Sequence, residues 1–274
     1  MVPFVKTNAL GNDFLLVKHT VVETSNLPKL ATHMCDRQFG IGADGLITWE
    51  STGDEVQIRI FNMDGTEAEC SGNGLRCVAA YLMNHDQVGV ETIRITTVSG
   101  TYSIRKLEDR FETNMGKPGV LPMEIPFIGP EGLNRVVNHP IEVNGEQILI
   151  TATSTGNPHC SLFVDSFEDE TIAELGPKLE THRVFPNRTN VEFIRVLNRN
   201  EIEVVFWERG VGRTNSSGTG SCGATVASVL TDRTDRQVRV HTLGGTLEVH
   251  WELTDDLTLT GTATIVAEGH YLNF

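Results

Sequence analysis

The sequence predicts an α+β protein built from two related halves, in which short strands outnumber helices. Three observations support this class. Runs rich in Val, Ile, Thr and Phe recur along the chain between turn-forming residues. Only a few segments have helical periodicity, and two of these are rich in small apolar residues. The order of strands, glycine-rich loop and helix occurs twice.

The predicted strands are short and bounded mostly by Gly, Pro, Asn or Asp. They cover residues 14–17, 56–61, 92–97, 147–153, 161–164, 191–195, 202–207, 237–241 and 246–250. The predicted helices cover residues 27–37, 74–84 and 220–230. A boundary between the halves falls near residues 116–129, where Pro and Gly are concentrated.

Composition excludes several classes of protein. The 274 residues carry a net charge of −14 and no cluster of Lys and Arg, so nucleic-acid binding is not expected. No apolar stretch approaches the roughly 20 residues that a membrane-spanning helix needs. The N-terminal residues do not resemble a signal peptide. We therefore expect a cytoplasmic protein that binds neither nucleic acid nor membrane.

The cysteines and histidines do not form a metal-binding pattern. The five cysteines are odd in number and contain no C-x-x-C pair, and the nine histidines show no H-x-x-x-H spacing. We expect neither a metal site nor a disulfide framework.

The repeated loop is the most informative feature of the sequence. Residues 71–74 (SGNG) and 217–220 (SGTG) each follow strands and open a helix. The first amides of a helix lack intrahelical acceptors and, with the helix dipole, favour an anion. Two such starts on one carboxylate would place a side chain on each face of the adjacent carbon, as stereoinversion by two bases requires. The plain alternative is that Ser71 and Ser217 are ordinary helix N-caps.

Seven segments together resemble the diaminopimelate epimerase family, in the family's order and over nearly the whole chain. They are residues 9–14 (ALGNDF), 40–45 (GIGADG), 61–65 (FNMDG), 72–77 (GNGLRC), 155–160 (TGNPHC), 208–212 (ERGVG) and 218–220 (GTG). The resemblance implies two pseudo-symmetric halves, each a curved, mostly antiparallel sheet around a central helix. It also implies that a last strand, at about 263–274, completes an N-terminal half of residues 1–117, with residues 118–262 forming the C-terminal half.

The resemblance also implies an activity. The family inverts the α-carbon of LL-2,6-diaminopimelate to give the meso form, a precursor of lysine and peptidoglycan. It uses two bases and no cofactor, neither pyridoxal phosphate nor metal, and it commonly forms homodimers. The expected partner is therefore a small amino-acid substrate.

Matching residues extend the resemblance to a binding site. Asn12, Asn62, Asn157 and Asn190 match positions that bind the distal end of the substrate. Arg209 matches the arginine that pairs with the distal carboxylate, a task suited to a planar guanidinium. The positions that cradle the reacting carboxylate are Gly72, Asn73, Gly218 and Thr219, and those that tune the catalytic pair are His159 and Glu208.

Each of these residues also has an ordinary structural interpretation. An asparagine in a loop usually stabilises its own turn. His159 is then a structural histidine, and Glu208 with Arg209 is an exposed polar pair at the end of a strand.

The chain departs from the family pattern at the two catalytic positions. The family has cysteine immediately before each glycine-rich run, and this chain has Ser71 and Ser217. A thiol at a helix N-terminus ionises far more readily than a serine hydroxyl, which needs an adjacent base. Cys70 and Cys222 are displaced along the sequence and do not replace the missing thiols. His159 or Glu208 would supply the base, with serine passing the proton on.

Four explanations fit the two serines. The chain is a natural branch that still epimerises, a branch with lyase or tautomerase chemistry on a related amino acid, a binding homologue that has lost catalysis, or a designed double variant that traps ligand. The retained asparagines and Arg209 favour a diaminopimelate-like ligand in all but the second case. The symmetric loss of both cysteines, with the loops intact, argues against random decay.

Overall fold

The computed structural model describes residues 1–52, 55–86 and 90–272. The chain divides into two compact units, Met1–Asn114 with Thr260–Phe274, and Met115–Leu259. Within the described ranges, every helix is too short or too polar to cross a membrane.

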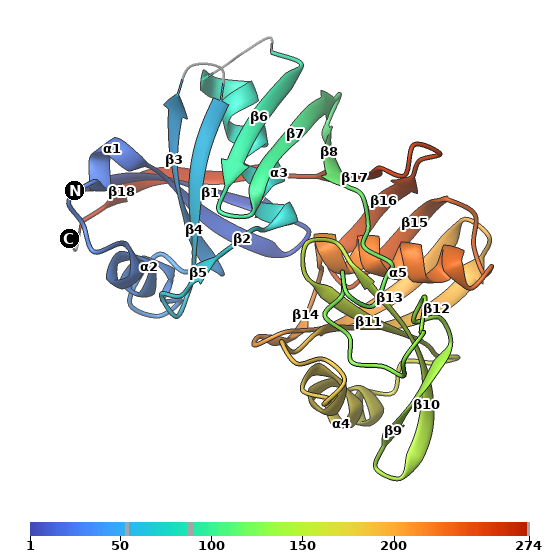
Figure 1. Cartoon of the computed structure of the whole chain (residues 1–274). Helices are drawn as coiled ribbons and strands as arrows, with labels where there is room; N and C mark the ends of the chain where they lie inside the picture. Colours follow the sequence, from blue (N-terminus) through green and yellow to red (C-terminus); the bar gives the residue numbers. More distant parts are fainter. Residues whose placement is uncertain (53–54, 87–89, 273–274) are drawn as a thin grey trace. The chain divides into compact units, whose positions relative to one another are not determined.

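The first unit is a mixed sheet in which antiparallel hairpins are joined through parallel strand pairs. Its strands are β1 (Val2–Ala9), β2 (Asn12–Lys18), β3 (Gly45–Thr52), β4 (Glu55–Asn62), β5 (Glu67–Ala68), β6 (Thr92–Thr97), β7 (Gly100–Leu107), β8 (Arg110–Gly116) and β18 (Thr264–Tyr271). The pairs β2–β3 and β4–β6 are parallel, and the other pairs are antiparallel. The C-terminal strand β18 runs antiparallel to β1, with Val2 opposite Tyr271 (Figure 1).

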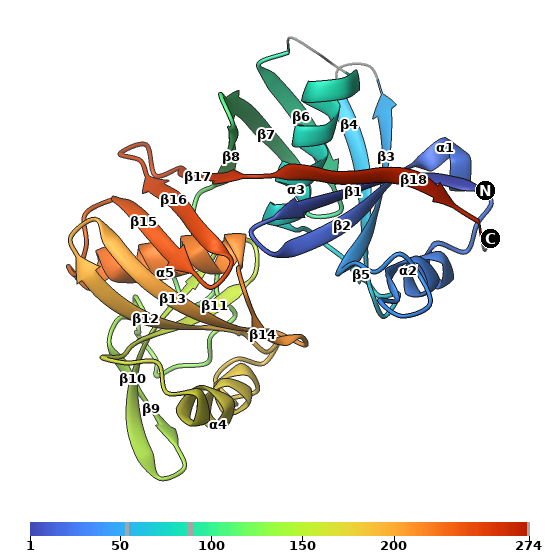
Figure 2. The same ribbon diagram turned by 180° about the vertical axis from the view of Figure 1, so that it is seen from behind.

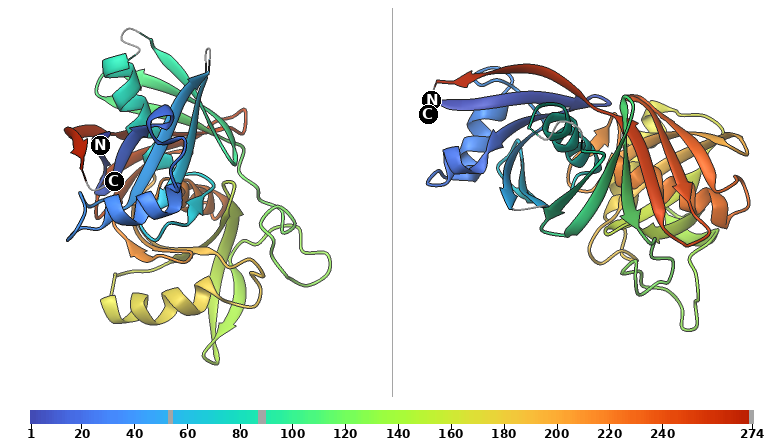
Figure 3. Two further views of the ribbon diagram at one scale, coloured as in Figure 1. Left: turned by 90° about the vertical axis from the view of Figure 1, so that its left-hand side faces the viewer. Right: turned by 90° about the horizontal axis from the view of Figure 1, so that it is seen from above.

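The first unit buries one helix almost completely. Its helices are α1 (His19–Val22), α2 (Leu27–Cys35) and α3 (Gly72–Tyr81), and α3 continues as the π-helical turn η1 (Leu82–Asp86). The strands curve around α3, as Figure 3 shows on the right. Leu75, Val78 and Ala79 of α3 share one apolar core with Phe14 and Ile47 of the sheet. The sheet thus fixes the start of α3, where Ser71 is the N-cap.

The second unit repeats this order of elements. Its strands are β9 (His139–Val143), β10 (Glu146–Ser154), β11 (Pro158–Phe163), β12 (Asn190–Asn198), β13 (Glu201–Glu208), β14 (Gly212–Thr214), β15 (Gln237–Thr242), β16 (Gly245–Trp251) and β17 (Leu257–Thr262). The parallel pairs are β11–β12 and β13–β15. Antiparallel hairpins separate them, as in the first unit.

A small-residue helix lies against this second sheet. The helix α5 (Gly218–Leu230) follows β14, and α4 (Asp169–Glu180) connects β11 to β12. Figure 2 shows α5 lying along strands β12, β13 and β15. Ala224, Val226 and Ala227 of α5 are fully buried, because their small side chains let the helix approach the strands closely.

The predicted α+β class with two similar halves is confirmed. Each predicted strand lies at an observed strand, and each predicted helix is present with shifted ends. The helices α3 and α5 begin two residues earlier than predicted, at Gly72 and Gly218, because each serine caps its helix directly. The prediction missed α4, whose apolar residues are few, and strands such as β1, β3 and β7.

Candidate functional site

Ser217 lies at the start of α5 with partners on both sides of its hydroxyl. It is buried and in extended conformation, and its Oγ accepts a hydrogen bond from Gly220 N at 3.2 Å. The same hydroxyl donates to Glu208 Oε2 at 2.9 Å. A side chain at Gly220 would place its Cβ 2.8 Å from the Phe206 ring and 3.0 Å from Ser217 Oγ. The absence of a side chain at Gly220 therefore lets the serine loop pack on β13.

Glu208 is the last residue of β13 and lies beside this serine. Burial raises the pKa of the Glu208 carboxyl, and the hydrogen bond from Ser217 partly opposes that rise. A carboxyl group with a raised pKa stores and releases a proton closer to neutral pH than an exposed glutamate does. Ser217 and Glu208 together form a hydroxyl–carboxylate pair of the kind that activates a serine.

His159 lies on β11, with partners at both ring nitrogens. Its Nδ1 is 2.6 Å from Glu192 Oε1, and both side chains are fully buried. Its Nε2 is 2.9 Å from Thr155 Oγ1 and 2.9 Å from Asn157 Oδ1. Glu192 was not predicted from the sequence, because a glutamate inside an apolar strand carries no motif of its own.

Arg209 belongs to a turn that is held from two directions. Its backbone N–H donates to Asn190 Oδ1 at 3.0 Å, and its guanidinium donates to Asn187 O at 3.2 Å. The next amide, Gly210 N, donates to Glu180 Oε1 of α4 at 2.8 Å. Glu180 is a second buried glutamate that the sequence analysis missed.

Both the oxygen and the nitrogen of the Asn190 side-chain amide form hydrogen bonds. Besides accepting from Arg209, it donates from Nδ2 to Pro158 O at 3.0 Å. Asn190 therefore ties the turn after β13 to the beginning of β11. Its predicted contact with the distal end of a substrate stays a prediction.

The loop of the first unit has the same cap and different neighbours. Ser71 Oγ accepts from Gly74 N at 3.1 Å, and Ser71 is in extended conformation before α3. Among the residues that the structure describes, no carboxylate or imidazole is hydrogen-bonded to Ser71. Asn73, the second residue of α3, is buried, and its side-chain amide donates to Asn12 Oδ1 at 3.2 Å.

A network of charged residues holds the side chain of Asn12 in place. Asn12 Nδ2 donates to Asp44 Oδ2 at 2.8 Å, and Arg37 bridges Asp44 and Asp13. Burial alone would raise the pKa of Asp13, but hydrogen bonds from Arg37 and Lys6 outweigh it and hold that pKa below its usual range. The network explains the aspartates of the segments ALGNDF and GIGADG as supports for Asn12, a role that the sequence analysis did not assign.

Among the described residues, the side chain of Asn62 makes only a local hydrogen bond. Its Nδ2 donates to Thr66 Oγ1 at 2.9 Å, within the turn that joins β4 to β5. This is the turn-stabilising role that an asparagine in a loop often has. The turn leaves Asn62 partly exposed at the end of β4.

The cysteines next to the two loops do not replace the missing thiols. Burial raises the pKa of the Cys70 thiol, which disfavours the thiolate. Cys77, one helical turn into α3, is fully buried with its pKa raised to about 11. Cys222 is fully buried inside α5.

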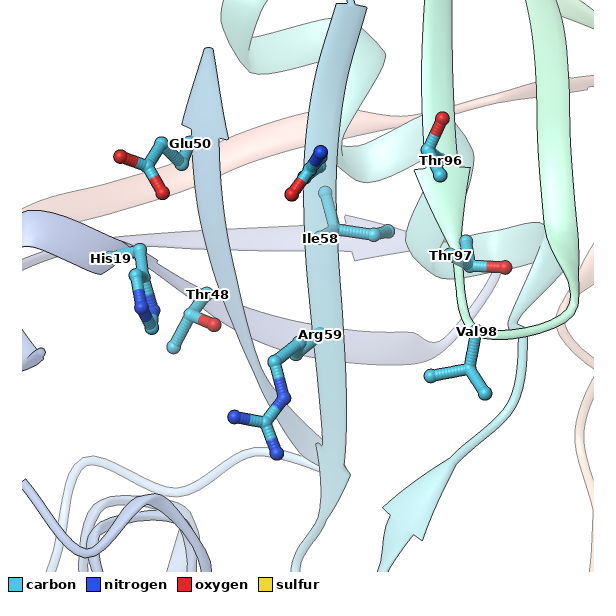
Figure 4. Close-up of a pocket in the computed structure, with 9 residues that line it drawn as sticks. His19, Thr48, Glu50, Ile58, Arg59, Thr96, Thr97 and Val98 are labelled. Atoms are coloured by element: carbon cyan, nitrogen blue, oxygen red, sulfur yellow. The ribbon is translucent and has the colours of Figure 1, made fainter. Parts of the chain in front are cut away.

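A cavity of about 240 Å³ lies in the first unit. It is lined by side chains of α1, β3, β4 and β6, among them His19, Thr48, Arg59 and Thr97 (Figure 4). None of its lining residues is among those predicted for the site. In the described part of the chain, no group of His, Cys, Asp and Glu is arranged to hold a metal ion.

Comparison with known proteins assigns the family. The sequence profile of diaminopimelate epimerase matches residues 4–121 and 151–266. Diaminopimelate epimerase of Pelotomaculum thermopropionicum is 44% identical over 98% of both chains, and that of Moorella thermoacetica is 42% identical over 98% of both.

Solved structures share the fold at much lower identity. A phenazine biosynthesis protein of the PhzF family from Bacillus anthracis has a TM-score of 0.70 and 15% identity, covering 100% of this chain and 99% of that one. A hydroxyproline epimerase from Agrobacterium vitis has a TM-score of 0.69 and 12% identity, covering 99% and 90%. These likenesses show the fold, and the sequence match shows that the chain belongs to the diaminopimelate epimerase family.

Proposed function

We propose that the protein is an isomerase that inverts the α-carbon of LL-2,6-diaminopimelate to give meso-diaminopimelate, with Ser71 and Ser217 in the two base positions. The hydrogen bond from Ser217 Oγ to Glu208 Oε2 carries the chemical part of this proposal. Membership of the family supports the choice of substrate, since relatives at 38–44% identity are named diaminopimelate epimerase.

One proton transfer can be written with the groups of the second loop. Ser217 Oγ takes the α-proton while its own proton passes to Glu208 Oε2, so the carbon–hydrogen bond breaks and the carboxylate becomes a carboxylic acid. The electron pair of the broken bond spreads into the neighbouring carboxylate of the substrate. In the opposite direction, Glu208 returns a proton through Ser217. The raised pKa of Glu208 favours this storage of a proton.

The helix starts supply a cradle for the reacting carboxylate. The first intrahelical backbone bonds are made by Leu75 N and Ser221 N. The amides of Gly72 and Asn73, and those of Gly218 and Thr219, precede them and are the donors that a helix start offers to an anion. Negative charge that develops on the substrate carboxylate during proton removal is stabilised by such donors.

The proposal assigns the distal part of the substrate to polar residues that match the family's positions. The proposal gives Arg209 the distal carboxylate, through a bidentate contact, and gives Asn12, Asn62, Asn157 and Asn190 the remaining polar contacts. His159 and Glu208 tune the proton transfers. The proposal includes a homodimer in the cytoplasm, and light scattering of the purified protein tests the dimer.

Deuterium exchange tests the proposal. The protein is incubated with LL-diaminopimelate in D₂O, and the product is analysed by mass spectrometry and by chiral chromatography. We expect deuterium at one α-carbon together with the meso form. Absence of deuterium at high protein concentration, with binding still seen by calorimetry, would identify a binding homologue and reject the epimerase.

A further inference from the structure

His159 and Glu192 form a fully buried pair on two parallel strands, β11 and β12. Nδ1 of the imidazole lies 2.6 Å from Oε1 of the carboxylate. The other carboxylate oxygen, Oε2, accepts from Ser161 Oγ at 3.1 Å. A carboxylate in such a place costs much free energy unless it is hydrogen-bonded and its charge is paired. The hydrogen bonds from His159 and Ser161 therefore stabilise the buried carboxylate of Glu192. The role of Glu192 follows from its effect on the protonation of His159.

The contacts of the imidazole decide where its protons lie. A carboxylate oxygen accepts, so the hydrogen between the two side chains lies on Nδ1 of His159. Nε2 faces the Thr155 hydroxyl, which can donate or accept, and Asn157 Oδ1, which accepts, each at 2.9 Å. Nε2 therefore has a partner in either state: without a proton it accepts a hydrogen bond from the Thr155 hydroxyl, and with a proton it donates one to Asn157 Oδ1.

The same ring lies directly against the helix that Ser217 caps. A Cβ at Gly223 of α5 would come within 2.8 Å of His159 Cγ, so the helix leaves space there for the imidazole. Thr155 Oγ1, the partner of Nε2, also lies 3.4 Å from Thr219 O in the serine loop. The protonation state of His159 Nε2 is therefore coupled, through the Thr155 hydroxyl, to the backbone of the serine loop.

We propose that Glu192 is a positioning residue for the epimerase: it fixes a proton on Nδ1 of His159 and leaves Nε2 as the one ring nitrogen that exchanges protons. The catalytic consequence rests on the proposed function. The placement of the proton does not, because it is a property of the protein without substrate.

Nuclear magnetic resonance of the imidazole nitrogens tests the proton placement. Protein labelled with ¹⁵N-histidine is compared with Glu192→Gln, and His159→Gln identifies the signals of the ring. We expect Nδ1 to be protonated in the original chain at neutral and acidic pH. In Glu192→Gln, the amide can donate as well as accept, so both tautomers become populated.

Ser161→Ala is the matched control, because it disturbs the same buried place and keeps the carboxylate. We expect its Nδ1 to remain protonated. Glu192→Asp is the second variant, which keeps the charge and withdraws the carboxylate by one methylene. It is expected to weaken the Nδ1 hydrogen bond and move its signal. A bare Nδ1 in the original chain, or an unchanged Nδ1 signal in both Glu192 variants, would overturn the proposal.

Exchange of the α-proton of diaminopimelate supplies the functional readout. We expect Glu192→Gln to lower kcat by roughly 10- to 100-fold with little change in KM, and to alter the pH profile of kcat. Ser161→Ala is expected to leave that profile in place. If the original chain catalyses no exchange, the proposed function fails, while the nitrogen signals still decide the role of Glu192.

Discussion

The two serine-capped helices begin alike but differ in the chemistry around the serine. In each, the hydroxyl accepts from the amide three residues on, and a glycine at that position packs against a strand. Ser71 stands as far in sequence from the end of β4 as Ser217 does from the end of β13. The residue at the first strand end is Asn62, and at the second it is Glu208. Only Ser217 has a carboxylate partner among the described residues.

The strand registers extend this comparison into the cores. Phe14 lies opposite Gly45 on β3, and His159 lies opposite Asn190 on β12. Two residues further along, Leu16 is opposite Ile47 and Ser161 is opposite Glu192. The first unit therefore buries Phe14 and Ile47 where the second unit buries His159 and Glu192. Both units have an apolar core, but at this pair of positions one holds two apolar side chains and the other an imidazole and a carboxyl group. Similarity of fold therefore does not make the two loops chemically equivalent.

Restoring cysteine at both positions is expected to have the largest effect. In Ser71→Cys/Ser217→Cys, thiols at two helix starts replace hydroxyls that hardly ionise, so epimerase activity rises by roughly 10²- to 10⁴-fold. Of the single variants, Ser71→Cys should gain more, because Ser217 already has Glu208 and Ser71 has no such partner. Deuterium exchange at the α-carbon measures all three rates. Equal gains from the two single variants would contradict the asymmetry.

Removing the carboxylate of Glu208 is expected to have the next largest effect. Glu208→Gln keeps an acceptor for Ser217 but takes no proton, so exchange in the original chain falls by about 10²-fold. Glu203→Gln, on the same strand and paired with Arg195, is the control and should change the rate less than twofold. Equal losses in the two variants would show that the loss is not specific to the carboxylate of Glu208.

The paired glycines provide a comparison of stability. In Gly220→Ala the new methyl meets the rigid Phe206 ring at 2.8 Å, and we expect a loss of about 2–3 kcal/mol in the free energy of unfolding. In Gly74→Ala it meets the flexible end of Ile47 at 3.0 Å, and the helix gains about 1 kcal/mol of propensity. Urea unfolding of both variants checks the order. A larger loss for Gly74→Ala would refute this account of the packing.

The smallest expected effect is on the pH dependence of stability. Because the pKa of Glu208 is raised in the folded chain, the folded state binds more protons than the unfolded state just above the ordinary glutamate pKa. Stability from this group is thus present at acidic pH and is lost as pH rises through the raised pKa. Glu208→Gln abolishes this loss, so its stability relative to the original chain should increase between about pH 4 and about pH 7. Urea unfolding at both pH values measures the change, and a constant difference would argue against the raised pKa.

Much of the architecture could be predicted from the sequence, because local patterns encode it. The runs of Val, Ile and Thr predicted the strands, and the two SGxG loops predicted the helix starts. Neither prediction requires knowledge of contacts between residues distant in sequence. The helix α4 was missed, since its surface is polar and its burial depends on β12 and β13. Of the predicted site residues, Ser217 lies within hydrogen-bond distance of Glu208, and Asn12 of Asn73. Their contacts with a substrate stay predictions.

The sequence by itself determined the family, the repeated loops and the exchange of cysteine for serine, because these are properties of residue type and order. Only the tertiary structure decided the partners. Glu192, Glu180 and Asp44 lie far along the chain from the groups they hold, and strand pairing or helix packing brings them there. The tertiary structure also decided that the two serines have different neighbours, since the strand register in each sheet determines which side chain lies beside each hydroxyl. A hydrogen bond between residues distant in sequence depends on the folded backbone, and no local pattern specifies it.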